Sequence, residues 1–157
     1  MKQLTVYAVA LSVSLIFAGT AASAEQTVIP NGSRPSKTAS SSQFTGNVRH
    51  EPVFPATEET PFSVSYVTFE PGARTFWHTH PAGQRLIVVS GQGLTGTWDG
   101  KIVTINPGDA IWCPPDIKHW HGATSTSAMT HIAITGMKDG KNVTWLEAVT
   151  DEQYQAK

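Results

Sequence analysis

Short runs of alternating or β-branched residues recur along most of the chain. Residues 62–70 and 129–135 alternate apolar and polar side chains, and residues 84–90 are rich in β-branched side chains. Alternation with a period of two is typical of a β-strand with one buried face. The first run ends at Pro71-Gly72 and the run after residue 84 ends at Gly91-Gln92-Gly93, both typical of turns. We therefore predict a strand at each of the three runs.

A hairpin is predicted between the second and third of these strands. Residues 94–98 and 101–105 flank Asp99-Gly100, a dipeptide typical of two-residue hairpin turns. Pro107-Gly108-Asp109 then precedes a further strand that runs to Cys113, and residues 151–155 have the character of a short helix. Strands that recur about every eight to twelve residues favour an all-β antiparallel sandwich or small barrel.

The first 24 residues are predicted to be a signal peptide. Lys2 precedes an almost wholly apolar stretch at residues 4–18, and Ala22-Ser23-Ala24 matches the small residues of a cleavage site. We expect cleavage after Ala24 and export to the periplasm or the outside of the cell. A retained membrane anchor is the alternative, but the apolar stretch is short for a membrane span, so we expect no membrane contact in the mature form.

The mature chain is predicted to be one domain preceded by a leader. Residues 25–43 are polar and Ser-rich, which favours a flexible leader, and residues 44–157 form the predicted folded domain. The whole chain has 11 basic and 12 acidic residues and no basic cluster, which argues against nucleic-acid binding. Because Cys113 is the single cysteine, no disulfide can form within the chain. Stability must come from the core, a bound metal or subunit contacts, and we expect a homo-oligomer.

Five of the six histidines occupy patterned positions, namely His78, His80, His119, His121 and His131. His78 and His80 form one pair with His-x-His spacing, and His119 and His121 form another. This spacing places both rings of a pair on one face of a strand. A buried imidazole without a partner costs roughly 1–3 kcal/mol, and a shared divalent cation satisfies several imidazoles at once. We therefore favour a metal site over hydrogen-bonded core histidines.

Two segments around these histidines resemble the conserved motifs of cupins. Gly72, His78-Thr79-His80, Gln84 and Gly91 have the spacing of the first cupin motif, and Gly108, Pro114 and His119 have that of the second. Gln84 stands where cupins usually have Glu, Asp116 where Gly is common, and Ala123 where Asn is common. Among cupins the chain is most similar to the small manganese-dependent hydroxynitrile lyases. The similar segments are GARTFWHTHPAGQ from Gly72, PGDAIWCPPDIKHWHGA from Pro107, AMTHIAI from Ala128 and VTDEQY from Val149.

The resemblance implies a single-domain jelly-roll barrel, the cupin double-stranded β-helix, with one metal ion. Its implied ligands are His78, His80, Gln84 and His119. Three imidazoles and an amide are uncharged, so the cation would keep its full charge and act as a Lewis acid. Manganese suits a mixed nitrogen and oxygen set, with iron as the alternative, whereas zinc is more often four-coordinate.

The resemblance also implies how the pocket is built. His121 and His131 would line it as proton carriers, with His121 favoured as the base, although His131 has a second interpretation as a hydrogen-bonded core residue. Val67 and Thr75 would line the same pocket. Phe76 shares the parity of His78, so we expect it to line the pocket as well.

The predicted function is therefore that of a metal-dependent lyase. It would cleave a cyanohydrin to an aldehyde and hydrogen cyanide, or catalyse the reverse reaction. Because the cupin fold serves many chemistries, two alternatives stay open. One is an oxygenase or dioxygenase acting on an enediol or catechol, and the other is a non-catalytic metal-binding cupin. All three interpretations imply a small-molecule ligand or a metal ion as the partner.

Overall fold

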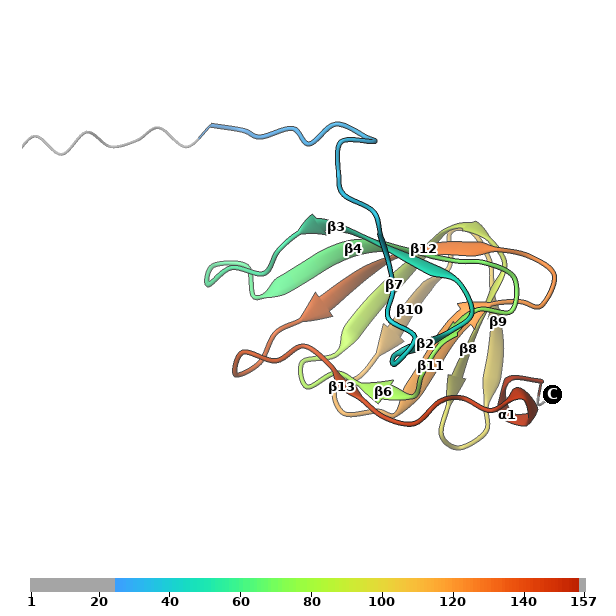
Figure 1. Cartoon of the computed structure of the whole chain (residues 1–157). Helices are drawn as coiled ribbons and strands as arrows, with labels where there is room; N and C mark the ends of the chain where they lie inside the picture. Colours follow the sequence, from blue (N-terminus) through green and yellow to red (C-terminus); the bar gives the residue numbers. More distant parts are fainter. Residues whose placement is uncertain (1–24, 156–157) are drawn as a thin grey trace, which may run out of the picture.

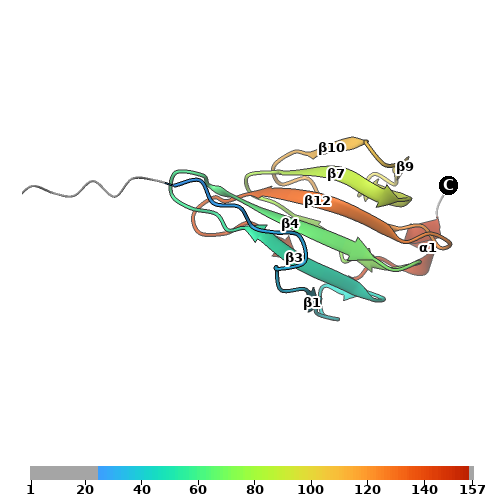
Figure 2. The same ribbon diagram turned by 90° about the horizontal axis from the view of Figure 1, so that it is seen from above.

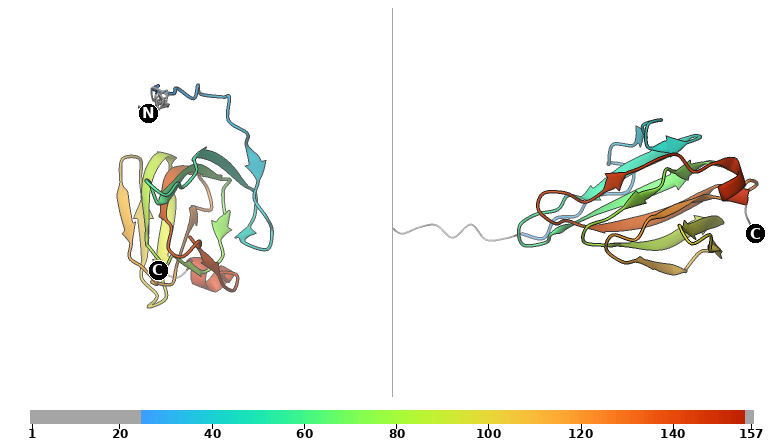
Figure 3. Two further views of the ribbon diagram at one scale, coloured as in Figure 1. Left: turned by 90° about the vertical axis from the view of Figure 1, so that its left-hand side faces the viewer. Right: turned by 90° about the horizontal axis from the view of Figure 1, so that it is seen from below.

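Two curled antiparallel sheets form the body of the protein in a computed structural model that describes residues 25–155 (Figure 1). The first sheet has the strand order β1 (Lys37–Thr38), β3 (Val48–Phe54), β4 (Phe62–Phe69), β12 (Met129–Gly136), β7 (Gln84–Gly91), β10 (Ala110–Cys113). The second has the order β13 (Thr144–Trp145), β6 (His78–Thr79), β11 (His119–Ala123), β5 (Arg74–Thr75), β2 (Phe44–Thr45). It also contains β8 (Gly93–Thr97), paired with β11, and β9 (Ile102–Ile105), paired with β8. Figures 2 and 3 show the sheets from other sides.

The three strands predicted from the hydrophobic pattern are confirmed as β4, β7 and β12. The strand β12 alternates buried and half-buried side chains along its whole length, as expected for one face turned to the interior. It pairs with β4 on one side and β7 on the other, so it lies in the middle of the first sheet. His131 on its inner face is therefore surrounded by protein and is fully buried.

The predicted hairpin is also confirmed. The strands β8 and β9 pair around a turn at Asp99-Gly100, where Gly100 has a positive φ of 87°. Because β8 also pairs with β11 along its full length, this hairpin extends the sheet that carries His119 and His121. The predicted C-terminal helix is present as α1 (Asp151–Gln155).

The prediction that residues 25–43 lack structure is wrong for their last part, because Lys37–Thr38 forms β1 and pairs with β3. The strand β3 itself was not predicted. The two misses have different causes. The strand β1 is held by backbone hydrogen bonds and has no apolar pattern, whereas Pro52 coincides with a register shift that interrupts the alternation in β3. The predicted signal peptide lies outside the described residues and stays a prediction.

The interior consists of two hydrophobic clusters. The larger draws its buried residues from both sheets, and includes Val67, Phe69, Leu86 and Met129. The smaller contains Trp77, Trp120, Val149 and Tyr154. Because Trp120 alternates with His119 and His121 along β11, the smaller cluster lies on the opposite face of that strand from the histidines. Among the described residues, no helix has the length and apolar character needed to cross a bilayer.

Candidate metal centre and active site

Neighbouring strands bring three of the predicted ligands together. His78 on β6 and His119 on β11 are directly opposite each other in the antiparallel pairing, so their side chains leave the same face of the sheet. His80 follows just after β6. One ring nitrogen from each of the three lies within 4.8 Å of the others, and all three side chains are buried.

A backbone carbonyl fixes the tautomer of each of these imidazoles. The Nδ1 atoms of His78 and His119 lie 2.9 Å and 2.8 Å from carbonyl oxygens, and His80 makes the same kind of contact. The carbonyl of Phe76 accepts from His78, that of Asn142 from His80, and that of Ile117 from His119. A carbonyl can only accept, so Nδ1 carries the hydrogen and Nε2 keeps its lone pair. The Nε2 atoms of His80 and His119 are buried without any hydrogen-bond partner.

Gln84 contributes an oxygen to the same donor set. It is the first residue of β7, its side chain is buried, and its Oε1 atom has no hydrogen-bond partner. A contact between the Gln84 side chain and His80 partly offsets the lowering of the His80 pKa by burial. Gln84 lines the same cavity as His78 and His80, so the amide lies beside these imidazoles.

The three imidazoles are uncharged at neutral pH. Burial lowers the pKa of His119 to about 4. Burial, and then repulsion from His119 and His80, holds the pKa of His78 well below its ordinary value. Buried nitrogen and amide oxygen atoms that lack partners and carry no proton are what a divalent cation binds, so the residues fit a single metal ion.

A second histidine pair lies beside this group. His121 follows His119 by two residues on β11 and lines the same interior face, and His131 faces it from β12. His131 Nε2 and His121 Nδ1 are 3.1 Å apart, so one ring donates to the other. His121 Nε2 and His131 Nδ1 are buried without partners. Burial lowers the pKa of His131 to about 4, so this ring is neutral as well.

A cavity of about 380 Å³ opens onto these histidines. Val67 and Thr75 line it, as predicted from the resemblance, and Thr75 Oγ1 accepts a hydrogen bond from the His121 backbone. Phe76 does not line it, which corrects that prediction. The chain leaves strand geometry between β5 and β6, so Phe76 does not share a face with His78 and contributes its carbonyl instead.

Several residues that line the cavity were not predicted from the sequence. Residues 37–40 of the supposed leader line it, as do His50 on β3 and Ser63 and Ser65 on β4. Burial and the nearby Lys37 charge lower the pKa of His50. The alternation of residues 62–70 could have placed Ser63 and Ser65 on the inner face with Val67. No pattern in the sequence indicated that residues 37–40 return to the cavity.

The C-terminal segment supports two of the metal-site histidines. Trp145 on β13 is paired with His78, and their ring centroids are 4.9 Å apart. The carbonyl of Asn142 accepts the hydrogen bond from His80. This segment therefore determines how the two imidazoles are oriented, although it lies more than 60 residues further along the chain.

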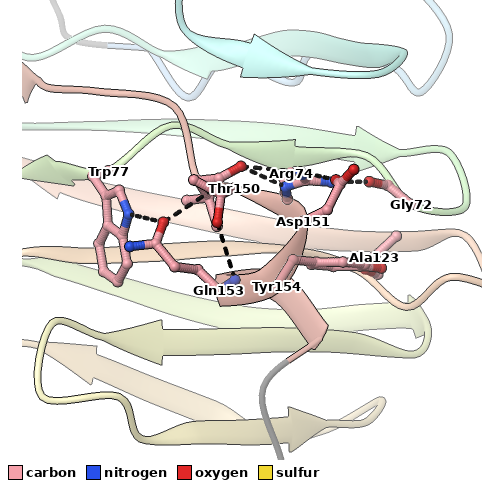
Figure 4. Close-up of polar contacts among 9 residues, drawn as sticks. Gly72, Arg74, Trp77, Ala123, Thr150, Asp151, Gln153 and Tyr154 are labelled. Atoms are coloured by element: carbon pink, nitrogen blue, oxygen red, sulfur yellow. Dashed lines mark hydrogen bonds and ion pairs between the residues drawn. The ribbon is translucent and has the colours of Figure 1, made fainter.

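A buried arginine fastens the end of this segment (Figure 4). Arg74 donates two hydrogen bonds to the carbonyl of Val149 and one to Asp151, and its guanidinium lies 4.7 Å from the centre of the Tyr154 ring. Thr150 and Gln153 satisfy each other's backbone N–H groups at the start of α1, which is a capping box. Arg74 does not line the cavity, so it holds the tail rather than a substrate.

Known proteins resemble the chain over nearly its whole folded part. The family described as "Cupin domain" matches residues 65–135. A curated protein named (R)-mandelonitrile lyase, from Granulicella tundricola, is 52% identical over 124 residues, which are 79% of this chain and 95% of that protein.

Solved structures of other proteins also resemble the chain. A cupin-like protein from Thermotoga maritima is 37% identical and superposes with a TM-score of 0.69, covering 83% of this chain and 96% of its own. A polyketide cyclase from Streptomyces resistomycificus has a TM-score of 0.65 at 13% identity, covering 83% and 92%, and shares the fold alone. The two curled sheets are thus a jelly-roll barrel, and the chain belongs to the cupin superfamily, as a near relative of a hydroxynitrile lyase.

Proposed function

We propose that the protein is a metal-dependent lyase that cleaves or forms cyanohydrins, with mandelonitrile as a test substrate. The observation that carries this proposal is the hydrogen-bonded pair His121–His131, held at 3.1 Å beside three imidazoles that fit a metal. A site that only bound a metal would not need two further buried histidines. The 52% identity to a protein named (R)-mandelonitrile lyase supports the same reaction class.

His78, His80, Gln84 and His119 would hold the cation, which we propose to be manganese, with iron as the alternative. When bound, it would supply positive charge that favours loss of a proton from a substrate hydroxyl. The four side chains add no negative charge of their own. The Nδ1–H contacts of the three imidazoles to backbone carbonyls keep the rings oriented toward the centre.

His121 is the proposed base. When its Nδ1–H donates to His131, its Nε2 atom has a free lone pair and can accept the hydroxyl proton. As the C–O double bond forms, the bond between this carbon and the nitrile carbon breaks, and its electron pair leaves with cyanide. The proton then returns to cyanide as hydrogen cyanide. Transfer of the Nδ1 proton to His131 Nε2 would let the two rings share the positive charge.

The cavity suits a small aromatic aldehyde. Its apolar wall includes Phe44, Val67, Ala133 and Trp145, and its volume of about 380 Å³ is in the range of small-molecule sites. Ser65 and Thr75 place hydroxyl groups among these side chains. An apolar wall with a few polar groups would hold the ring while leaving the oxygen beside His121.

The test compares two histidines of one strand. The mature protein, loaded with manganese, is assayed for benzaldehyde release from mandelonitrile while dissolved oxygen is recorded. We expect His121→Ala to keep its metal and to lose about 10²–10⁴-fold in kcat. His119→Ala should lose metal and activity together. Full activity of metal-loaded His121→Ala would contradict the assigned role.

The same assay separates the oxygenase alternative. With a catechol as substrate, our proposal predicts no oxygen uptake by either the manganese or the iron form. Uptake of oxygen without aldehyde release from mandelonitrile would favour an oxygenase. Metal binding without either reaction would favour a non-catalytic cupin.

A further inference from the structure

The amide of Gln84 has one partnered and one unpartnered end. Its Nε2 atom donates a hydrogen bond to Thr135 Oγ1 at 3.0 Å, while Oε1 has no partner. Both side chains are buried, at 5% and 7% exposure. The two residues are directly opposite each other in the pairing of β7 with β12, so the contact is built into the sheet register.

An amide in this position has two orientations of nearly the same shape. Only the oxygen can bind a cation, because the amide nitrogen has no available lone pair and carries two hydrogens. Rotation by 180° would turn those hydrogens toward the Nε2 atoms of the imidazoles. With Oε1 toward the imidazoles, the amide N–H group on the far side needs an acceptor, and without one the rotated orientation, whose N–H groups face the imidazole Nε2 atoms, is favoured. Among the described residues, Thr135 is the only hydrogen-bond acceptor of Gln84 Nε2.

We infer that Thr135 is a positioning residue, whose hydroxyl oxygen holds the Gln84 amide with Oε1 turned toward the three imidazoles. This rests on the metal centre of the proposed function but not on its reaction. Glutamate at position 84 would not need such help, because both of its terminal atoms are oxygens. Gln84 as a neutral ligand therefore depends on the hydroxyl of Thr135.

The test is a titration of manganese into the metal-free mature protein, read from the electron paramagnetic resonance signal of free Mn²⁺. Thr135→Val keeps the shape but has no acceptor, and we expect about 10–100-fold weaker binding. Thr135→Ser keeps the hydroxyl and should bind within about threefold of the parent. Thr130→Val is the matched control on the same strand, because its hydroxyl bonds only to Thr68 on the outer face. It should bind like the parent.

A second background distinguishes positioning from packing. In Gln84→Glu protein, the added Thr135→Val change should weaken manganese binding by less than about threefold, since either carboxylate oxygen can face the metal. An equal loss in both backgrounds, or no loss in either, would overturn the inference. If Thr135→Val does not fold, Thr135→Ala replaces it in both backgrounds. A parent protein that binds metal but lacks lyase activity would leave the inference standing, whereas one that binds neither manganese nor iron would remove it.

Discussion

Replacing Arg74 with methionine tests how the C-terminal segment is held. The Arg74 side chain is 7% exposed, and its guanidinium donates to the carbonyls of Val149 and Gly72 and to the carboxylate of Asp151 (Figure 4). Methionine keeps an apolar stem of similar length and removes every one of these donors. The Asp151 side chain, in contrast, is 77% exposed.

The hydrogen bonds of Arg74 to the Val149 carbonyl and to the Asp151 carboxylate should differ in what they contribute to stability. A hydrogen bond from a charged donor contributes roughly 1.5–3 kcal/mol, and a buried carbonyl left without a donor costs roughly 1–3 kcal/mol. Release of the buried charge offsets part of this, because its desolvation penalty disappears. We expect Arg74→Met to lower the free energy of unfolding by about 3 kcal/mol. Asp151→Asn should cost less than about 1 kcal/mol, since an exposed ion pair contributes little.

Urea unfolding of the two variants in the presence of a chelator measures this difference without a contribution from bound metal. With an m-value of about 2 kcal/mol/M, Arg74→Met should lower the midpoint by about 1.5 M and Asp151→Asn by less than about 0.5 M. Equal losses in the two variants would refute the reasoning, because the ion pair and not the Val149 carbonyl would then dominate.

Three further predictions concern stability and processing. Burial lowers the pKa of His131 from an ordinary 6.5 to about 4, so the unfolded chain binds the proton more readily. The metal-free protein should therefore lose stability as the pH falls from 6.5 to 4 in urea titrations, with roughly 3 kcal/mol of the loss due to His131, and an unchanged midpoint would contradict this. Gly91→Ala should prevent folding, as measured by circular dichroism, because a Cβ would lie 1.8 Å from the Ala128 carbonyl oxygen. In Gly108→Ala the Cβ would meet no atom within 4 Å, so this change should cost only about 1–2 kcal/mol of stability. Intact-mass analysis of exported protein should find Glu25 at the N-terminus, and an intact Met1 would contradict cleavage.

The sequence predicted the parts of the fold that follow a regular pattern. The strands β4, β7 and β12 were predictable because one of their faces is buried, which enforces alternation. The strand β1 was not, because backbone pairing with β3 holds it and its side chains are exposed. Its position along the cavity depends on contacts between distant segments, which no local pattern records.

The candidate site divides in the same way. His-x-His spacing indicated which imidazoles share a face, since that depends only on strand geometry. Phe76 was misplaced because parity holds only within a continuous strand, and the chain bends between Thr75 and His78. The contact of His80 with the carbonyl of Asn142 joins segments 62 residues apart. Only the fold could reveal it.

Diffraction from crystals of the manganese-loaded protein, with anomalous data that locate the metal, tests the central claim most directly. Our account predicts one metal position per chain, bound by the Nε2 atoms of His78, His80 and His119 and by Oε1 of Gln84. His121 and His131 should remain hydrogen-bonded to each other and not coordinate the metal. A metal bound elsewhere, no metal at all, or an amide of Gln84 turned away from the three imidazoles would contradict the account.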